Sequence, residues 1–316
     1  MLKEVLPCGQ SFDPAEKWDS GNVDAGDKQL NAHRRSSEVG VSQTTTMEPS
    51  TLLSLPAEIR TEILEHVFAD QIHVDGFSNR NVAGGITLDE KYKASDVLRV
   101  LLICRQLYHD AALIALRRTA FAVNSLYISN NIPDRLAVLH PKQLSALRNI
   151  AFVADAVHFR KLNEWGEYPW GLQRLNLDSI SIVLHRSSFW HYLFDYTSDI
   201  TRLLRRLKGV RRLIFVRNQA LVKGSFKTWY NRLIGLMMKV DHQERYLKDP
   251  PRLEQTWWTW SYDDLSQSFC LESAPPKAFE DEATYMEQIA PLMEAWTVSV
   301  ENEEWNPDPR ARNAYY

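Results

Sequence analysis

Three apolar runs typical of β-strands recur along the middle of the chain at nearly equal intervals. Their centres lie near Ile150, Ile180 and Leu213, about 30 and 33 residues apart. Intervals of this length accommodate a crossover helix, and crossover helices join neighbouring parallel strands. The spacing therefore predicts either helices layered on a largely parallel sheet or an irregular solenoid similar to a degenerate leucine-rich repeat.

The segments around these strands show the apolar spacing of three and four residues that is typical of helices. Helices are expected in 135–149, 189–209, 226–247 and, after two adjacent prolines, once within 254–296. Together these elements predict an α/β domain over residues 130–300, followed by a polar tail over 301–316. Residues 1–48 are polar and lack periodicity, which predicts a disordered leader.

An apolar segment that opens with Leu-Pro predicts a helix over residues 54–69. Pro56 lies in the first turn, where a missing N–H loses no hydrogen bond, and Glu58 follows, where the helix dipole favours a carboxylate. Arg60 lies off the apolar face, which is expected to be buried. The positions on that face are Ile59, Ile63, Leu64, Val67 and Phe68.

A second, longer helix is expected from Ser95 or Asp96 to Arg118, because either side chain can cap free N–H groups. Between the two helices, residues 72–93 contain Gly-Gly and are expected to form a loop or a small hairpin. The helices and this insertion define a helical unit over residues 50–125. The apolar positions of the second helix are Leu98, Leu101, Cys104, Tyr108, Ala111 and Ala115.

The two helices carry a two-part motif. Leu55-Pro56-x-Glu58-Ile59 opens the first helix, and the second contains Leu101-Leu102-x-Cys104-Arg105, followed by Tyr108. In order, residue type and helical context, this pair resembles the F-box, in the divergent form common in filamentous fungal proteins. The resemblance covers residues 52–123. It implies an α+β protein in which an F-box-like unit precedes an α/β, leucine-rich-repeat-like domain.

In F-box proteins the helical unit binds the Skp-type adaptor of a cullin–RING ubiquitin ligase, while the rest of the chain holds a protein substrate. The resemblance therefore implies a substrate-recognition adaptor that is not an enzyme, has no cofactor and acts in the cytoplasm or nucleus. The substrate itself is not identified by the sequence. The residues implied to bind the adaptor are Leu55, Pro56, Ile59, Ile63, Leu101, Cys104 and Arg105.

The chain departs from the F-box pattern in one respect, because about 30 residues separate Phe68 from Leu98. The insertion either loops outward and leaves the docking surface intact, or replaces that surface. In the alternative reading, the apolar residues of both helices face inward, as in any α-rich domain. The chain is then an F-box-like scaffold that does not bind the adaptor.

Other features argue against several classes of function. No apolar run reaches the roughly 18 residues of a membrane-spanning helix, and the N-terminus does not resemble a targeting signal. Cys8, Cys104 and Cys270 are far apart, and the histidines are scattered, so no metal site is expected. The chain also lacks the common hydrolase, P-loop and dinucleotide-binding motifs.

Charge is distributed unevenly in the C-terminal half. Residues 201–248 carry 13 Lys and Arg against 2 acidic residues, whereas residues 249–316 carry 4 against 14. Clustered basic residues make nucleic acid an alternative partner, but no recognised nucleic-acid-binding motif accompanies them, and the acidic segment can neutralise them. Nucleic acid is thus the less favoured partner. The basic patch comprises Arg202, Arg205, Arg206, Lys208, Arg211 and Arg212.

An aromatic cluster is the most unusual local feature of the C-terminal segment, and it comprises Trp257, Trp258, Trp260 and Tyr262. Such clusters occur both at binding hot spots and in cores closed under long loops. The cluster is therefore a candidate recognition surface, with a packing role as the alternative. The adjacent Asp263 and Asp264, like the acidic run at 280–282, are expected to be solvated.

Overall fold

The computed structural model describes residues 52–69, 76–79, 85–190, 193–222 and 225–305. The expected leader over 1–48 lies outside these residues, as does the part of the expected tail from 306 onward.

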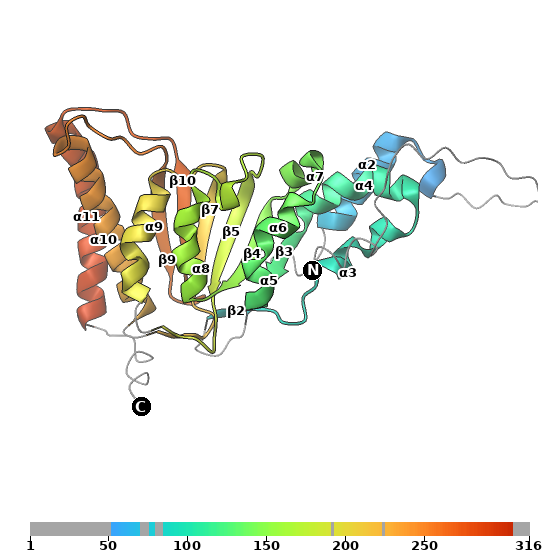
Figure 1. Cartoon of the computed structure of the whole chain (residues 1–316), viewed down its shortest axis with the longest axis horizontal. Coiled ribbons are helices and arrows are strands. Elements are labelled where there is room, and N and C mark those ends of the chain that lie inside the picture. Colours follow the sequence, from blue (N-terminus) through green and yellow to red (C-terminus); the bar gives the residue numbers. More distant parts are fainter. Residues whose placement is uncertain (1–51, 70–75, 80–84, 191–192, 223–224, 306–316) are drawn as a thin grey trace, which may run out of the picture.

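A six-stranded mixed sheet forms the centre of the described chain, with the strand order β3-β4-β5-β7-β10-β9 (Figure 1). The strands β3, β4, β5 and β7 run parallel in chain order, whereas β10 is antiparallel to both β7 and β9. The fold is therefore a mixed α+β fold. The strands are β3 (Ala120–Val123), β4 (Asn149–Ala154), β5 (Leu177–Leu184), β7 (Val210–Val216), β9 (Trp257–Asp263) and β10 (Ser268–Ala274).

The three strand centres expected from the sequence lie in one cross-strand row. Ile150 pairs with Ile180, and Ile180 pairs with Leu213. All three side chains are buried. The parallel arrangement inferred from their spacing is confirmed.

The helices that connect the parallel strands lie along one face of the sheet (Figure 1). After β3 come α5 (Leu126–Asn130), α6 (Ile132–Ala137) and α7 (Pro141–Ala146); after β4 come α8 (Ala156–Lys161), η3 (Leu162–Trp165) and η4 (Pro169–Gly171). After β5 come η5 (Leu193–Tyr196) and α9 (Thr197–Leu204), and after β7 comes α10 (Phe226–Tyr246). A short parallel pair joins β6 (Phe189–Trp190) to β8 (Leu221–Val222). The last helix, α11 (Glu282–Trp305), packs against α10.

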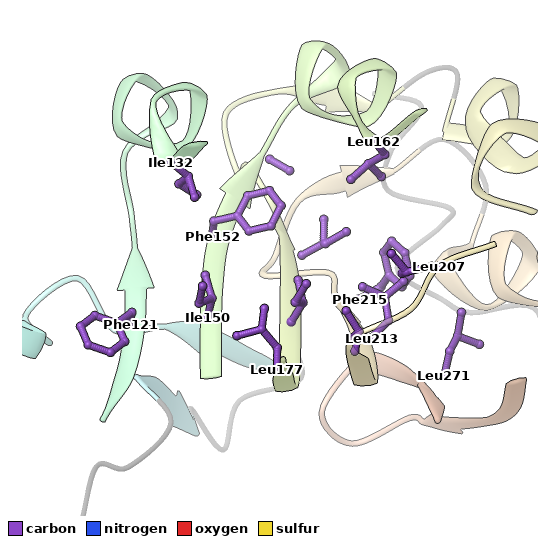
Figure 2. Packing of buried hydrophobic residues seen from close by; sticks show 14 of the residues in the cluster. Phe121, Ile132, Ile150, Phe152, Leu162, Leu177, Leu207, Leu213, Phe215 and Leu271 are labelled. Carbon is purple, nitrogen blue, oxygen red and sulfur yellow. The ribbon is translucent and has the colours of Figure 1, made fainter. Parts of the chain in front are cut away.

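The main core lies between these helices and the sheet. Phe152, Leu213 and Phe215 project from the strands into this layer, where Ile132 of α6 and Leu162 of η3 meet them (Figure 2). All five side chains are at most 4% exposed, so they form a closed apolar interior. Burial of a side chain of this size contributes about 1.5–3 kcal/mol, before the entropy of ordering is subtracted.

Two parts of the sheet differ from the sequence-based expectation. β3 was not expected, and the stretch 254–264, expected to contribute to a helix, contains the whole of β9. β9 is half of a hairpin in which Trp260 lies opposite Leu271. Residues 257–263 form a strand because they pair with β10 across the turn. The apolar spacing within the segment alone does not show this pairing. The helix expected over 189–209 is also shorter, because β6 takes its first two residues and the helical segments η5 and α9 together span only Leu193–Leu204.

The insertion between the two N-terminal helices lies against the other face of the sheet. It contains a hairpin of β1 (Phe77–Asn79) and β2 (Ile86–Leu88), which confirms the expected hairpin. The Ile86 N–H donates to Ser266 O at 2.8 Å, and the Leu88 N–H donates to Asn218 Oδ1 at 3.1 Å. The described part of the insertion is thus bonded to the sheet. Its apolar contacts are with Ala122, Ala151, Val153, Val183 and Val216.

The expected second helix is divided into three segments: α3 (Ala94–Val97), η2 (Leu98–Leu102) and α4 (Arg105–Arg118). The prediction of a single helix over this stretch was therefore wrong. Cys104 is extended, with φ −158° and ψ 162°, and its Sγ accepts a hydrogen bond from the Leu107 N–H at 3.5 Å. A side chain that caps the N-terminus of a helix competes with a continuous helical backbone at that position.

The helical unit and the sheet share one apolar core, to which Leu64, Phe68, Leu98 and Leu101 belong together with the strand residues. Among the described helices, none is long and apolar enough to cross a membrane.

Candidate docking surface

Helix α2 (Ala57–Ala69) begins directly after Pro56, and the turn η1 (Leu52–Ser54) leads into it. The Arg60 N–H donates to Pro56 O at 3.1 Å and closes the first turn. Because proline has a fixed φ and no N–H, it is well suited to the position where a helix starts. The Leu-Pro pair therefore determines where α2 begins.

Arg60 connects α2 to α4 and to the turn before α2. Its Nε donates to Asp110 Oδ2 at 2.8 Å, and its Nη1 donates to Leu55 O at 2.5 Å. The two charged side chains are only 9% and 18% exposed. Leu64 and Phe68, on the same face as Arg60, are each 2% exposed. This face of α2 is held against α4 by both packing and charge.

A neighbouring face of α2 presents apolar side chains to solvent. Leu55, Ile59, Ile63 and Val67 recur at steps of four residues, and they are 37%, 45%, 36% and 44% exposed. We refer to these four residues as the α2 stripe. Exposed apolar side chains that share one face make this stripe a candidate interaction surface.

The α2 stripe corrects the expectation that the whole apolar face is buried. Consecutive residues of a helix point about 100° apart. Because α4 covers the face that carries Arg60, Leu64 and Phe68, the positions one residue earlier remain outside the contact. Arg60, expected to lie off the buried face, is part of it.

The residues expected to bind from the second helix are divided between the core and the surface. Leu101 is buried, Cys104 is half-buried as the cap of α4, and Arg105 is exposed. Leu102 and Ile103 are 64% and 69% exposed, and the sequence did not single them out as surface residues. They lie at the break before α4, and the sequence carries no signal for that break, because cysteine is not a favoured residue at the start of a helix.

Comparison with known proteins adds no relative of this chain. No family model, no curated protein and no solved structure matches it.

The expected basic patch is largely paired with carboxylates. Arg206 donates to Asn163 O at 2.7 Å, and Arg212 is exposed on β7. The hydrogen bond that Lys208 Nζ donates to Glu167 raises the pKa of Lys208. The oppositely charged segments meet as expected, for example where Lys227 pairs with Asp264 at 3.5 Å. The ion pairs within the patch are Arg202–Asp199, Arg205–Asp241, Lys208–Glu167 and Arg211–Glu272, at 2.5–3.4 Å.

The aromatic cluster on β9 packs against the core. Trp258 is 2% exposed, and its Nε1 donates to Leu204 O at 2.8 Å. Trp257, Trp260 and Tyr262 are half-buried against the same core. The cavity beside the three tryptophans is only about 20 Å³. The cluster leaves too little space for a ligand larger than a water molecule, so packing is its main role.

A buried charged cluster, which the sequence did not reveal, joins α10, α11 and the segment before β9. Arg245 is fully buried, and its guanidinium contacts Asp241 at 3.1 Å and Glu254 at 2.5 and 2.6 Å. The Tyr285 hydroxyl donates to Asp241 at 2.5 Å. Burial and the charge of Asp241 raise the pKa of Glu254. These groups satisfy one another, so the cluster is structural.

The acidic runs serve as local caps. Asp263 accepts a hydrogen bond from the Leu265 N–H in the β9–β10 turn, and Asp281 accepts one from the Thr284 N–H at the start of α11. Within the part of the chain that the structure describes, no group of three or more His, Cys, Asp and Glu is placed to hold a metal ion.

Proposed function

We propose that this chain is an F-box-like protein that acts as a substrate-recognition adaptor of a cullin–RING ubiquitin ligase. The observation that carries the proposal is the α2 stripe. Ile59 and Ile63 of the F-box-like motif are exposed on a helix whose neighbouring face is anchored, and Leu55 is exposed just before that helix. These three motif residues are therefore available to a Skp-type adaptor.

The chemistry of the stripe suits an apolar groove. Each Leu or Ile that moves from water into a groove contributes about 1.5–3 kcal/mol at most, and a few such anchors supply most of the energy of an interface. A helix already held by Arg60 and Asp110 binds without an ordering cost. Leu102 and Ile103 add exposed apolar surface in the same helical unit.

The sheet domain is proposed to hold the protein substrate. Its first four strands follow one another in chain order with helices on one face, an arrangement similar to an irregular leucine-rich repeat, from which the antiparallel β10 and β9 depart. The mechanism is proximity, because a tethered substrate reaches the ubiquitin-transferring partner at a high effective concentration. The chain itself supplies no catalytic group in this scheme.

Co-purification with the Skp-type adaptor tests this function. The wild-type chain is expected to form a stoichiometric complex that Leu55→Asp with Ile59→Asp abolishes, because buried carboxylates without partners are costly. A matched control is Val138→Asp with Leu265→Asp, since these side chains are 68% and 90% exposed outside α2. The control is expected to retain the complex.

Circular dichroism and thermal melting establish that each variant is folded. A folded wild-type protein that forms no complex would contradict the proposal and favour the scaffold that has lost the adaptor. Equal complex formation by the stripe variant would show that the docking face lies elsewhere.

A further inference from the structure

A cavity of about 190 Å³ lies in the helical layer between the connections that follow β3 and β4. Its wall combines residues of α5, α6, β4, α8, η3 and η4. Figure 2 shows Phe152 on β4 projecting between Ile132 of α6 and Leu162 of η3, and Phe152 and Leu162 belong to this wall. The site lies near the carboxyl end of β4.

Three aromatic rings form one side of the cavity. The ring centroids of Phe152 and Trp170 are 5.9 Å apart, and those of Trp165 and Trp170 are 4.9 Å apart. Trp170 has a φ of 52°, a left-handed conformation that a tryptophan rarely adopts. Backbone strain of this kind persists where the surroundings hold a side chain in place, and it clusters at ligand sites.

Two buried polar atoms belong to residues of the same wall. His158 and Ser129 are 6% and 4% exposed, and neither His158 Nε2 nor Ser129 Oγ has a hydrogen-bond partner. An unpaired buried polar atom carries its full desolvation penalty, about 1–3 kcal/mol. A ligand that pairs with these atoms would remove this penalty.

The other nitrogen of His158 determines what Nε2 offers. His158 Nδ1 lies 2.6 Å from Asp155 Oδ1, and the Asp155 N–H also approaches Nδ1 at 3.2 Å. One nitrogen cannot donate and accept at once, and the shorter contact with a carboxylate is the stronger. Nδ1 therefore donates to Asp155, and Nε2 of the neutral ring is an acceptor. Burial alone would raise the pKa of Asp155, but the hydrogen bonds from His158 lower it below its usual value.

The charged residues of the wall do not select an ion. Lys161 and Glu164 are both exposed and of opposite charge, and Lys161 Nζ donates to Asn130 Oδ1 at 3.2 Å. The interior therefore offers aromatic faces, one acceptor and one hydroxyl. This complement suits a neutral ring with one or two polar groups better than a sugar, whose many hydroxyls would lack partners.

We propose that this cavity binds a small neutral aromatic compound that carries a hydroxyl group, that is, a phenol. The hydroxyl donates to His158 Nε2, and Ser129 Oγ pairs with a polar atom of the ligand. The volume is adequate, because a cavity of about 150 Å³ holds benzene. This ligand site goes beyond the adaptor function and does not depend on it.

No reaction is included in the proposal. Ser129, His158 and Asp155 are the residue types of a nucleophilic triad, but Ser129 Oγ makes no hydrogen bond with His158, so the imidazole does not activate it.

The test uses the full chain and two fluorinated probes of nearly equal shape, 4-fluorophenol and 4-fluorotoluene, observed by ¹⁹F NMR titration. We expect saturable binding of 4-fluorophenol and about tenfold weaker binding of 4-fluorotoluene, which lacks the donor. Equal affinities, or no saturation with 4-fluorophenol up to about 10 mM, would overturn the proposal.

Two variants locate the binding site. Ser129→Ala is expected to weaken 4-fluorophenol binding about fivefold and to leave 4-fluorotoluene binding unchanged. Ser145→Ala is the matched control, because the Ser145 hydroxyl is exposed on α7 and bonds only to Lys142 O among the described contacts. If both variants bind 4-fluorophenol like the wild type, the phenol site is not this cavity.

His158→Phe keeps a ring at the wall and removes the acceptor, so the preference for 4-fluorophenol over 4-fluorotoluene should fall clearly below tenfold. Its melting temperature is measured first, because the substitution also removes the contact with Asp155. A folded variant that keeps the tenfold preference would contradict the role of Nε2.

Discussion

Arg60 of α2 and Asp110 of α4 form a 2.8 Å ion pair on the face of α2 next to its exposed stripe. The pair aligns α2 on the rest of the fold, so the stability of the helical unit and the exposure of the stripe are linked.

Replacement of Arg60 by Ala should destabilise the protein by about 2–4 kcal/mol, because the partly buried Asp110 loses its partner. Arg99→Ala is the matched control: Arg99 pairs with Asp96, but the two side chains are 76% and 49% exposed. In urea denaturation, Arg99→Ala should lower the free energy of unfolding by less than about 0.5 kcal/mol. Equal effects of the two substitutions would contradict the structural role of Arg60.

The orientation of α2 is tested by two adjacent residues. Leu64 is 2% exposed and Ile63 is 36% exposed. Leu64→Ala should therefore cost about 2–5 kcal/mol, and Ile63→Ala much less than half as much. Chemical denaturation of both variants measures the difference. A larger loss for Ile63 would mean that the stripe faces the core.

Gly85 holds the β1–β2 hairpin against the sheet. It has a φ of +79°, and a Cβ there would lie 2.4 Å from Ser266 O. Gly171 has a similar φ of +73°, but nothing lies within 4 Å of a Cβ at that position. Gly171→Ala should thus cost about 1 kcal/mol from backbone strain alone, and Gly85→Ala clearly more. Thermal melting compares the two variants.

Hydrogen exchange supplies a second readout for the hairpin. The Ile86 N–H, which donates to Ser266 O, should lose protection in Gly85→Ala and keep it in Gly171→Ala. Unchanged protection in both variants would show that the hairpin is not held at this point.

Tyr230 makes the protein less stable at high pH. Burial raises its pKa from 10.0 to about 12, so folding favours the neutral phenol. The stabilisation that the neutral Tyr230 side chain gives to the folded state is complete below pH 10.0, and it is lost as the pH rises towards about 12. Between pH 9 and 11 this loss is on the order of 1 kcal/mol.

Tyr230→Phe should remove this part of the alkaline loss, as measured by urea denaturation at the two pH values. Tyr127→Phe is the control, because the Tyr127 side chain is 76% exposed. If both variants lose stability with pH as the wild type does, Tyr230 does not titrate with folding.

The buried cluster around Arg245 supplies a further test. Arg245→Met leaves the buried Glu254 without its counter-charge and leaves Asp241 paired with Arg205 alone, and it should cost about 3–5 kcal/mol in urea denaturation. The double variant Arg245→Met with Glu254→Gln should recover part of the loss, because one buried charge is removed. A double variant less stable than the single one would contradict this electrostatic explanation.

The regular elements were largely predictable from the sequence. The spacing of Ile150, Ile180 and Leu213 predicted parallel strands, because both the periodicity and the crossover length are local properties of the chain. The start of α2 was predictable only to within three residues, because the helix was expected from residue 54 with Pro56 in its first turn and begins at Ala57, directly after Pro56. The β9–β10 hairpin and the division of the second helix at Cys104 were not, because strand pairing and capping compete with the periodicity of each segment.

For the candidate sites, too, some features were predictable from the sequence and others depended on the tertiary structure. The sequence by itself determined that α2 carries apolar residues at Leu55, Ile59 and Ile63, but a pattern of four-residue steps does not state which face a neighbour covers. Only the tertiary structure decided that α4 covers Arg60, Leu64 and Phe68 and leaves the stripe exposed. It likewise brought Ser129, Phe152 and His158 together around one cavity, although they lie on three separate elements. Burial is a property of the whole packed chain, and local periodicity constrains only which residues share a face.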